Sequence, residues 1–270
     1  MKEKIGYIDL ASSLNLKPDD VLFIGADLTR LAYASAKNRV PFDVNKFIDS
    51  FLEQLPNGTL VIPTYTDDFH QGMTFDVRKS KPNIGALAVA AFKRKDAYRT
   101  VDPFHSVAVW GKHIPLFESI VDNSTFGTNS AFGLLHQLKA KMLMIDVSLN
   151  QNFTFVHYCE EQAKVSWRKN VNHHIHIINH LGVESEVDCN FYTRKMGYIN
   201  SLDPLEKVFE REKIMNITEI FNIPLRMIDL PMAYSSIILD INENNGRNIH
   251  QFSIYEWVRI LTKRILFSRK

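Results

Sequence analysis

Residues 43–65 read DVNKFIDSFLEQLPNGTLVIPTY, and this stretch decides the fold class. From Asp43 onward its apolar residues recur three and four positions apart, which predicts an amphipathic helix. Pro56-Asn57-Gly58 ends that helix, and the apolar, β-branched run over 59–65 then predicts a buried strand. A second buried strand is predicted upstream over 21–24. The resulting strand, helix, strand unit is typical of a layered α/β domain with helices covering a central sheet.

The same alternation of strands and helices continues along the chain. Asn83 and Ser130 are the candidate capping residues of two helices. We expect helices over 83–92, 130–139, 153–163, 205–215 and 255–266, and strands over 106–110, 141–147, 173–179 and 190–198. We therefore predict one domain over 1–270, with a motif-bearing half at 1–168 and a second half at 169–270 that completes the same sheet.

The composition excludes several classes of protein. The 270 residues are 45% hydrophobic and 23% charged, which is close to the average of soluble globular proteins and unlike disordered chains. The net charge is only +2 and is spread along the chain, so nucleic acid is not expected as a partner. The longest apolar run, 84–92, is too short to cross a membrane, and Glu3 and Asp9 interrupt any signal peptide. With only Cys159 and Cys189 present, we expect a cytoplasmic protein without a disulfide framework.

His157 and Glu160 are the first candidates for chemistry. They are three positions apart in the predicted helix FVHYCEEQ, so both side chains leave one face. A histidine beside a carboxylate can abstract a proton, because the carboxylate fixes the imidazole tautomer and stabilises its charged form. Glu161, four positions from the histidine, is an alternative partner, and an ordinary surface pair is the structural alternative. Asn152 and Thr154 place small polar groups just before the pair, after a buried strand where α/β folds gather ligands.

Asp102-Pro103-Phe104-His105-Ser106 is a second polar cluster. The imidazole of His105 and the hydroxyl of Ser106 can orient a substrate or polarise a carbonyl group. Equally, Asp102 can simply close a turn by accepting hydrogen bonds from the backbone of Phe104 or His105. The sequence leaves both interpretations open.

Two other features favour structural roles. Four histidines cluster at His173, His174, His176 and His180, but no cysteine or carboxylate lies at ligand spacing among them, so we predict exposed strand histidines and no metal. Cys159 is turned about 100° around the helix from Glu160, which favours packing over a role as a thiol nucleophile. The sequence contains no dinucleotide-binding, P-loop or nucleophile-elbow motif.

Five stretches, in order, resemble the aminoglycoside N3-acetyltransferase family, whose members transfer an acetyl group from acetyl-CoA to an amine of an amino sugar. They are NGTLVIPTYT at 57–66, FDVRKSKPNIGALAVAAFKR at 75–94, DPFHSVAVWG at 102–111, FGTNSAFGLL at 126–135 and MLMIDVSLNQNFTFVHYCEEQAKVSWR at 142–168. The resemblance covers roughly residues 18–168. It implies a three-layer α/β/α sandwich with a central mixed sheet, with acetyl-CoA as cosubstrate and no metal.

The resemblance also assigns roles to residues. The family's N-T-x-x-H-x-x-E run is similar to residues 152–160, with one residue inserted, which makes His157 the general base and Glu160 its orienting partner. It implies that the hydroxyls of Ser106 and Thr154 lie near the acetyl group. The other expected substrate contacts are His105, Asp102, Asp67 and Asp68, and the expected CoA contacts are Asp27, Thr29, Arg30, Thr64 and Arg78.

Three departures from the family bear on the substrate. Gly25-Ala26-Asp27 replaces a His-Ser-Ser-like string that contacts CoA, and Asp102 replaces the first histidine of an H-P-x-x-S motif. The loop over 65–74 is short and offers only Asp67 and Asp68 to a polycationic antibiotic. We therefore expect an acceptor amine on a nucleotide-linked sugar or a sugar destined for a surface glycan. Acetylation of an aminoglycoside, a non-catalytic ligand-binding relic and a Cys159-dependent hydrolase are the alternatives, and the oligomeric state, monomer or homodimer, stays open.

Overall fold

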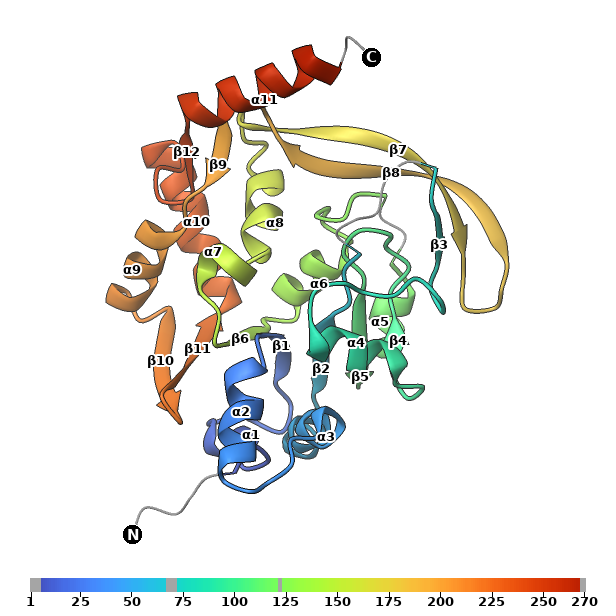
Figure 1. The fold of residues 1–270 in the computed structure, drawn as a ribbon, viewed down its shortest axis with the longest axis vertical. Coiled ribbons are helices and arrows are strands. Elements are labelled where there is room, and N and C mark those ends of the chain that lie inside the picture. Colours follow the sequence, from blue (N-terminus) through green and yellow to red (C-terminus); the bar gives the residue numbers. More distant parts are fainter. Residues whose placement is uncertain (1–5, 67–71, 121–122, 268–270) are drawn as a thin grey trace.

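A central sheet of seven strands organises the computed structural model, which describes residues 6–66, 72–120 and 123–267 (Figure 1). The elements are α1 (Leu10–Ser13), β1 (Val21–Ala26), α2 (Thr29–Lys37), α3 (Val44–Gln54), β2 (Thr59–Pro63), β3 (Thr74–Asp76), α4 (Ala86–Lys93), β4 (Tyr98–Arg99), β5 (Val107–Gly111), α5 (Ile114–Glu118), α6 (Ala131–Gln137), β6 (Lys141–Ile145), α7 (Leu149–Asn152), α8 (Phe155–Gln162), β7 (Arg168–Ile178), β8 (Glu184–Arg194), β9 (Tyr198–Asn200), α9 (Asp203–Arg211), β10 (Met215–Ile220), β11 (Ile223–Asp229), α10 (Leu230–Asn244), β12 (His250–Phe252) and α11 (Ile254–Phe267).

The strand order of the central sheet is β10-β11-β6-β1-β2-β5-β4. β1 runs parallel to both β2 and β6, whereas the β2–β5, β5–β4, β6–β11 and β11–β10 pairs are antiparallel. The prediction of an α/β fold with a mixed central sheet is therefore confirmed.

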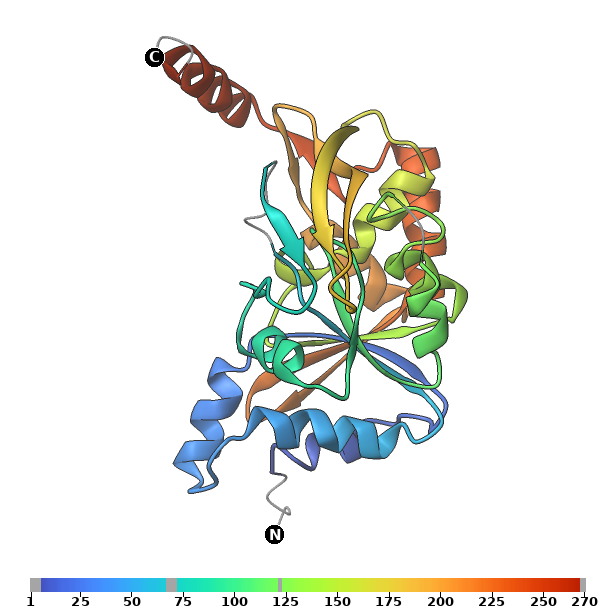
Figure 2. The same ribbon diagram turned by 90° about the vertical axis from the view of Figure 1, so that its right-hand side faces the viewer.

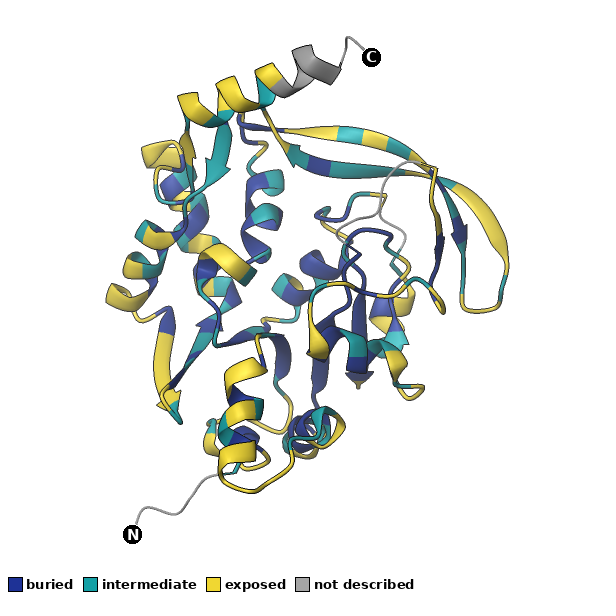
Figure 3. Cartoon of the chain, in the orientation of Figure 1, coloured by how far each residue is buried: buried dark blue, intermediate teal, exposed yellow. Residues whose placement is uncertain are grey.

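Both faces of this sheet are apolar and both carry helices. Successive residues of a strand point to opposite faces, so Phe23 of β1 joins one buried cluster while its neighbours Leu22 and Ile24 join the other. Helices α1 to α4 pack on the Leu22 side, and α6, α8 and α10 pack on the Phe23 side. Figure 2 shows these two groups on either side of the sheet, and Figure 3 shows that β1, β2, β5 and β6 between them are mostly buried, whereas the edge strand β10 is mostly exposed.

The starts of three helices show their capping, which the sequence predicts for two of them, at Asn83 and Ser130. Asp43 accepts a hydrogen bond from the backbone of Asn45 at the start of α3, and Ser130 caps α6 as predicted. The predicted start of α4 at Asn83 is wrong. The helix begins at Ala86 after Gly85, whose φ of 118° is incompatible with a helix and favours glycine.

The second half of the chain only partly completes the central sheet. β10 and β11 join its edge, but β7 and β8 pair with β3 in a separate three-stranded sheet, and β9 pairs with β12 in another. The prediction that the second half completes one sheet is therefore wrong for 168–200. β7 and β8 form a long antiparallel ribbon that extends beyond the body of the molecule, and α11 projects from the opposite end of that ribbon (Figures 1 and 2).

Candidate active site

The pair at His157 and Glu160 forms at the end of the central strand β6. The chain leaves β6, makes the short helix α7, whose start is closed by a capping box between Ser148 and Gln151, and then enters α8 at Thr154. One turn along α8, His157 Nδ1 lies 2.7 Å from Glu160 Oε2. The two side chains therefore share a face of the helix and are in hydrogen-bond contact.

The Glu160 carboxylate is enclosed by partners from three segments. Only 1% of its side chain is exposed. Trp167 Nε1 donates to Oε1 at 2.7 Å, and Arg168 Nε lies 2.5 Å from Oε2. The backbone carbonyl of Glu160 also accepts from the Tyr192 hydroxyl at 3.1 Å. A buried carboxylate with this many donors remains ionised and holds its neighbours in fixed positions.

The His157 imidazole is less enclosed, with 17% of its side chain exposed and the Phe126 ring packed edge-on at 5.6 Å. Burial lowers its pKa below the ordinary histidine value, and the nearby Arg168 cation lowers that pKa further, while Glu160 opposes both effects. Burial alone would raise the pKa of Glu160, but the contacts with His157, Arg168 and Trp167 outweigh it and keep the pKa below the ordinary value. Donation from Nδ1 to Glu160 leaves Nε2 as the unprotonated, accepting nitrogen of the ring, 3.4 Å from the Arg168 Nη2 donor. An unprotonated ring nitrogen is what a general base requires.

Trp167 and Arg168 are functional neighbours that the sequence analysis did not identify. Arg168 Nη2 lies 2.8 Å from His157 Nδ1, so the pair is in fact a triad. Trp167 stacks on His250 at 3.7 Å, which fixes the indole that donates to Glu160. Trp167 lies between the end of α8 and β7, Arg168 is the first residue of β7, and no spacing in the sequence marks them as partners of the pair.

The two alternatives within α8 have other roles. Glu161 Oε1 accepts from the Ser124 hydroxyl at 2.6 Å, so this carboxylate does not take the place of Glu160. Cys159 is completely buried, its thiol lies 3.5 Å from the Phe155 carbonyl, and burial raises its pKa well above the ordinary thiol value. A thiol of this kind is a packing group and a poor nucleophile.

Thr64 and Ser106 lie together around a buried arginine. Neither residue is exposed, and the Ser106 hydroxyl donates to the Thr64 carbonyl at 2.8 Å. Arg99 donates through Nε to Ser106 Oγ at 3.0 Å and through Nη2 to the Thr64 carbonyl at 3.0 Å. Burial lowers the pKa of Arg99 to about 10. These hydroxyls therefore join β2 to β5 and are covered from solvent.

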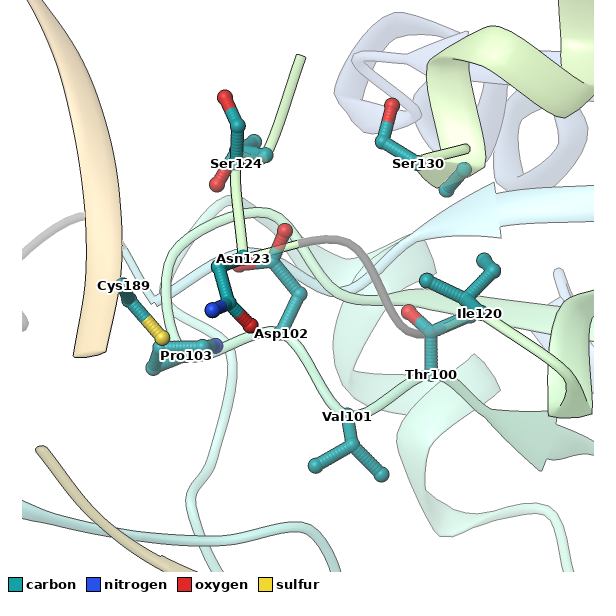
Figure 4. A pocket seen from close by; sticks show the side chains of 11 residues that line it. Thr100, Val101, Asp102, Pro103, Ile120, Asn123, Ser124, Ser130 and Cys189 are labelled. Atoms are coloured by element: carbon teal, nitrogen blue, oxygen red, sulfur yellow. The ribbon is translucent and has the colours of Figure 1, made fainter. Parts of the chain in front are cut away.

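Asp102 closes the turn that leads into β5. Its Oδ1 accepts from the backbone N–H of Phe104 at 2.8 Å and of His105 at 2.9 Å, which is the turn interpretation of this cluster. The adjoining cavity, which Asn123 and Cys189 also line, measures about 30 Å³ (Figure 4). That volume holds about one or two water molecules and excludes a sugar.

His105 and Thr154 are the predicted substrate contacts closest to the triad. The His105 ring packs at 5.0 Å against Phe126, the ring that also touches His157. Thr154 is half-buried at the start of α8, and its carbonyl accepts from the backbone of His157 at 3.0 Å. Asp67 and Asp68 lie outside the described residues.

The predicted CoA contacts after β1 are already in local contacts. Asp27 Oδ1 accepts from the backbone of Thr29 at 2.9 Å, and Arg30 pairs with Asp146 at 2.7 Å while more than half of its side chain stays exposed. Arg78, which follows β3, pairs with Asp76 at 3.1 Å.

The Asn152 side chain occupies the space beside Gly25. A Cβ atom on Gly25 would lie 1.8 Å from Asn152 Oδ1, so a larger residue at this position requires the Asn152 side chain to move. The contact joins the end of β1 to α7, which precedes α8 in the chain.

The clustered histidines on the ribbon pair with acidic residues of the neighbouring strand. His174 lies 3.0 Å from Asp188, and His176 lies 2.8 Å from Glu186. Within the ranges that the structure covers, no three histidine, cysteine or acidic side chains are grouped so that they could hold a metal ion.

A family model described as Aminoglycoside 3-N-acetyltransferase matches residues 26–238. The chain belongs to this family. The family resemblance stated from the sequence is thereby confirmed, and the acetyl-CoA-dependent N-acetyltransferases of this family share its mixed α/β fold. A search of curated proteins finds no match.

Solved structures of the family have the same fold. Aminoglycoside acetyltransferase AAC(3)-IVa is 19% identical over 91% of both chains, with a TM-score of 0.67. AAC-IIIb, solved as a binary complex with CoASH, is 15% identical over 92% of this chain and 98% of its own, with a TM-score of 0.73. The YokD protein from Bacillus subtilis is 15% identical over 90% and 94%, with a TM-score of 0.70. In the portion that the structure describes, no helix is both long and apolar enough to cross a membrane.

Proposed function

We propose that the chain transfers an acetyl group from acetyl-CoA to the amino group of an amino sugar that is nucleotide-linked or destined for a surface glycan. The His157–Glu160 contact carries this proposal, because it supplies a neutral, oriented imidazole in a family of N-acetyltransferases. The relative that was solved with CoASH supports acetyl-CoA as the cosubstrate.

The proposed reaction is a direct transfer. His157 Nε2 takes a proton from the acceptor amine while the nitrogen attacks the thioester carbonyl of acetyl-CoA, because a protonated amine has no lone pair for the attack. The tetrahedral intermediate collapses with cleavage of the carbon–sulfur bond, and the leaving thiolate of CoA takes up a proton. Glu160 stabilises the transient imidazolium through the Nδ1 contact.

The remaining predicted residues take supporting roles in this proposal. We place the reacting acetyl and amino groups of the substrates near His105 and Thr154. For the CoA phosphates we assign the start of α2 at Thr29 together with the guanidinium groups of Arg30 and Arg78, because helix N-termini and arginines are the groups that bind phosphate.

Charges near the triad support an anionic acceptor. A cavity of about 510 Å³ is lined by cationic side chains at Lys169, Arg194, Lys195 and Arg259, and its carboxylate, Glu256, is paired with Arg259 at 2.7 Å. Arg194 lies opposite Arg168 in the β7–β8 ladder, which places this cavity beside the triad's strand. A diphosphate is attracted by such a surface, whereas a polycationic aminoglycoside is repelled.

The alternative acceptor is an aminoglycoside, since AAC(3)-IVa, a member of the same family, has been solved in complex with apramycin and with a gentamicin. The two acceptors are separated by incubating the purified protein with acetyl-CoA and either nucleotide-diphosphate amino sugars or aminoglycosides, and by detecting the acetylated product by mass spectrometry. The proposal predicts a product that is heavier than the nucleotide-linked acceptor by about 42 mass units, the increment fixed by acetylation itself. The turnover number should lie in the range typical of enzymes, about 1–1000 per second.

His157→Ala is expected to abolish this product, and His174→Ala, on the exposed ribbon, is the matched control that retains it. If the protein acetylates aminoglycosides but no nucleotide-linked amino sugar, the proposed acceptor class is wrong and the acceptor is an aminoglycoside. If acetyl-CoA neither binds nor reacts with either panel, the chain is a non-catalytic relic and the proposal is refuted.

A further inference from the structure

Arg168 contacts both members of the catalytic pair. It is the first residue of β7, and only 4% of its side chain is exposed. Its Nε lies 2.5 Å from Glu160 Oε2, and its Nη2 lies 2.8 Å from His157 Nδ1 and 3.4 Å from His157 Nε2. A full positive charge is therefore held against the imidazole ring.

Contacts from two further strands hold this guanidinium in place. Nη2 donates to Asn200 Oδ1 of β9 at 3.1 Å, and Nη1 donates to the Tyr192 carbonyl of β8 at 3.3 Å. The Tyr192 ring lies 5.7 Å from the guanidinium carbon. Because three segments fix it, Arg168 cannot swing away from His157 without breaking several contacts.

A fixed cation at this distance opposes protonation of the ring. In the imidazolium both ring nitrogens carry hydrogens, so the charged ring would meet the Arg168 donors with donors of its own. Arg168 also neutralises Glu160, whose isolated charge would otherwise draw a proton onto the imidazole. Both effects favour the neutral ring.

We propose that Arg168 is a positioning residue that keeps the His157 ring unprotonated in the resting protein. The catalytic consequence rests on the proposed acetyl transfer, but the protonation state of His157 is a property of the folded chain alone.

Within the part of the chain that the structure describes, three charged groups act on the protonation of His157. Burial, Arg168 and the more distant Arg194 favour the neutral ring, and Glu160 opposes them. The other titratable groups on elements around α8 are engaged elsewhere: Glu161 with Ser124, His136 of α6 with Tyr158, His250 of β12 with Trp167, and Cys159 near the Phe155 carbonyl.

The test is an NMR titration of the His157 ring in protein labelled with ¹⁵N-histidine, with His157→Ala used to assign the signal. In the unmodified protein the midpoint should lie below that of an exposed histidine. Arg168→Gln should raise it, so that about tenfold more of the ring is protonated at a given pH above the midpoint. Arg168→Lys, which keeps the charge, should stay close to the unmodified protein.

Arg194→Gln is the matched control, because it removes a positive charge from the position directly opposite Arg168 on the neighbouring strand. Its side chain is exposed and screened by water, so its effect should be smaller than that of Arg168→Gln. An unchanged midpoint in Arg168→Gln, or an equal rise in Arg194→Gln, overturns the proposal. If Arg168→Gln fails to fold, the unmodified protein decides: a midpoint at or above that of an exposed histidine overturns the proposal, and a lower midpoint supports it.

The pH dependence of acetyl transfer provides the functional readout. In Arg168→Gln the rate at pH 6 relative to pH 8 should fall about tenfold more than in the unmodified protein. A merely structural role would lower both rates together and leave the ratio unchanged, which contradicts the proposal. If the chain transfers no acetyl group at all, the proposed function fails while the NMR titration still decides the role of Arg168.

Discussion

Replacing Glu160 by glutamine should destabilise the folded protein by about 3–5 kcal/mol, because the change leaves the buried Arg168 cation without its partner. Glutamine has the same shape, so the substitution removes the charge and little else. The carboxylate is 1% exposed, Arg168 Nε lies 2.5 Å from it, and both His157 Nδ1 and Trp167 Nε1 contact it at 2.7 Å. In the variant, the amide must turn a donor toward one of these donors.

For a chain of this size, 1 kcal/mol corresponds to about 2–4 °C in Tm, so a loss of roughly 10 °C is expected by calorimetry at pH 7.5. Glu256→Gln is the control, because its pair with Arg259 is partly exposed and should contribute less than about 1 kcal/mol. The double variant Glu160→Gln/Arg168→Gln should lose about 2 kcal/mol less stability than the sum of the losses of the two single variants. A Tm within 2 °C of the unmodified protein for Glu160→Gln would refute the reasoning.

Four further predictions concern the surroundings of the pair. Gly25→Ala should lower the free energy of unfolding by about 1–3 kcal/mol, because its Cβ meets Asn152. In thermal unfolding the double variant Gly25→Ala/Asn152→Ala should recover most of that loss. Additive losses in the double variant would show that the contact does not matter. Burial and the Arg168 charge lower the pKa of His157, so kcat/KM should stay constant down to pH values at which an ordinary histidine is already protonated. A decrease in kcat/KM that begins at pH 7 or above would be inconsistent with this. The same shift should make the folded state less stable as pH falls, since the unfolded chain binds this proton at a higher pH. Cys159→Ala should keep transferase activity, and iodoacetamide should not inactivate the native protein; loss of activity in both experiments would reinstate a thiol mechanism.

The local parts of the fold could be predicted from the sequence. The helix from Asp43 and the strand that follows Pro56-Asn57-Gly58 depend on apolar periodicity and turn residues, which act over a few positions. The shared face of His157 and Glu160 likewise follows from helix geometry alone, and the observed contact of 2.7 Å agrees with it.

Contacts between distant segments could not be predicted in this way. The alternating pattern of β7 and β8 indicates strands, but it does not say which sheet they join. They pair with β3, and Ile175 of β7 joins Phe75 and Phe104 in a small buried cluster of its own. The role of Arg168 depends on that ribbon returning to α8, and no spacing in the sequence encodes it.

The contact of Gly25 with Asn152 could not be predicted from the sequence either. In the sequence Gly25 departs from a family motif, and this departure alone suggests a damaged CoA contact. In the structure the missing side chain leaves room for Asn152, 127 positions further along the chain. Only the three-dimensional contact shows that the two positions depend on each other.

The central claim is that His157 is the base, and the rate of acetyl transfer by His157→Ala tests it most directly. With the acceptor that the unmodified protein acetylates, and with saturating acetyl-CoA, the variant should remain folded, bind CoA and transfer acetyl groups about 10²–10⁴ times more slowly. A folded variant that acetylates the same acceptor within about threefold of the unmodified rate would contradict the account.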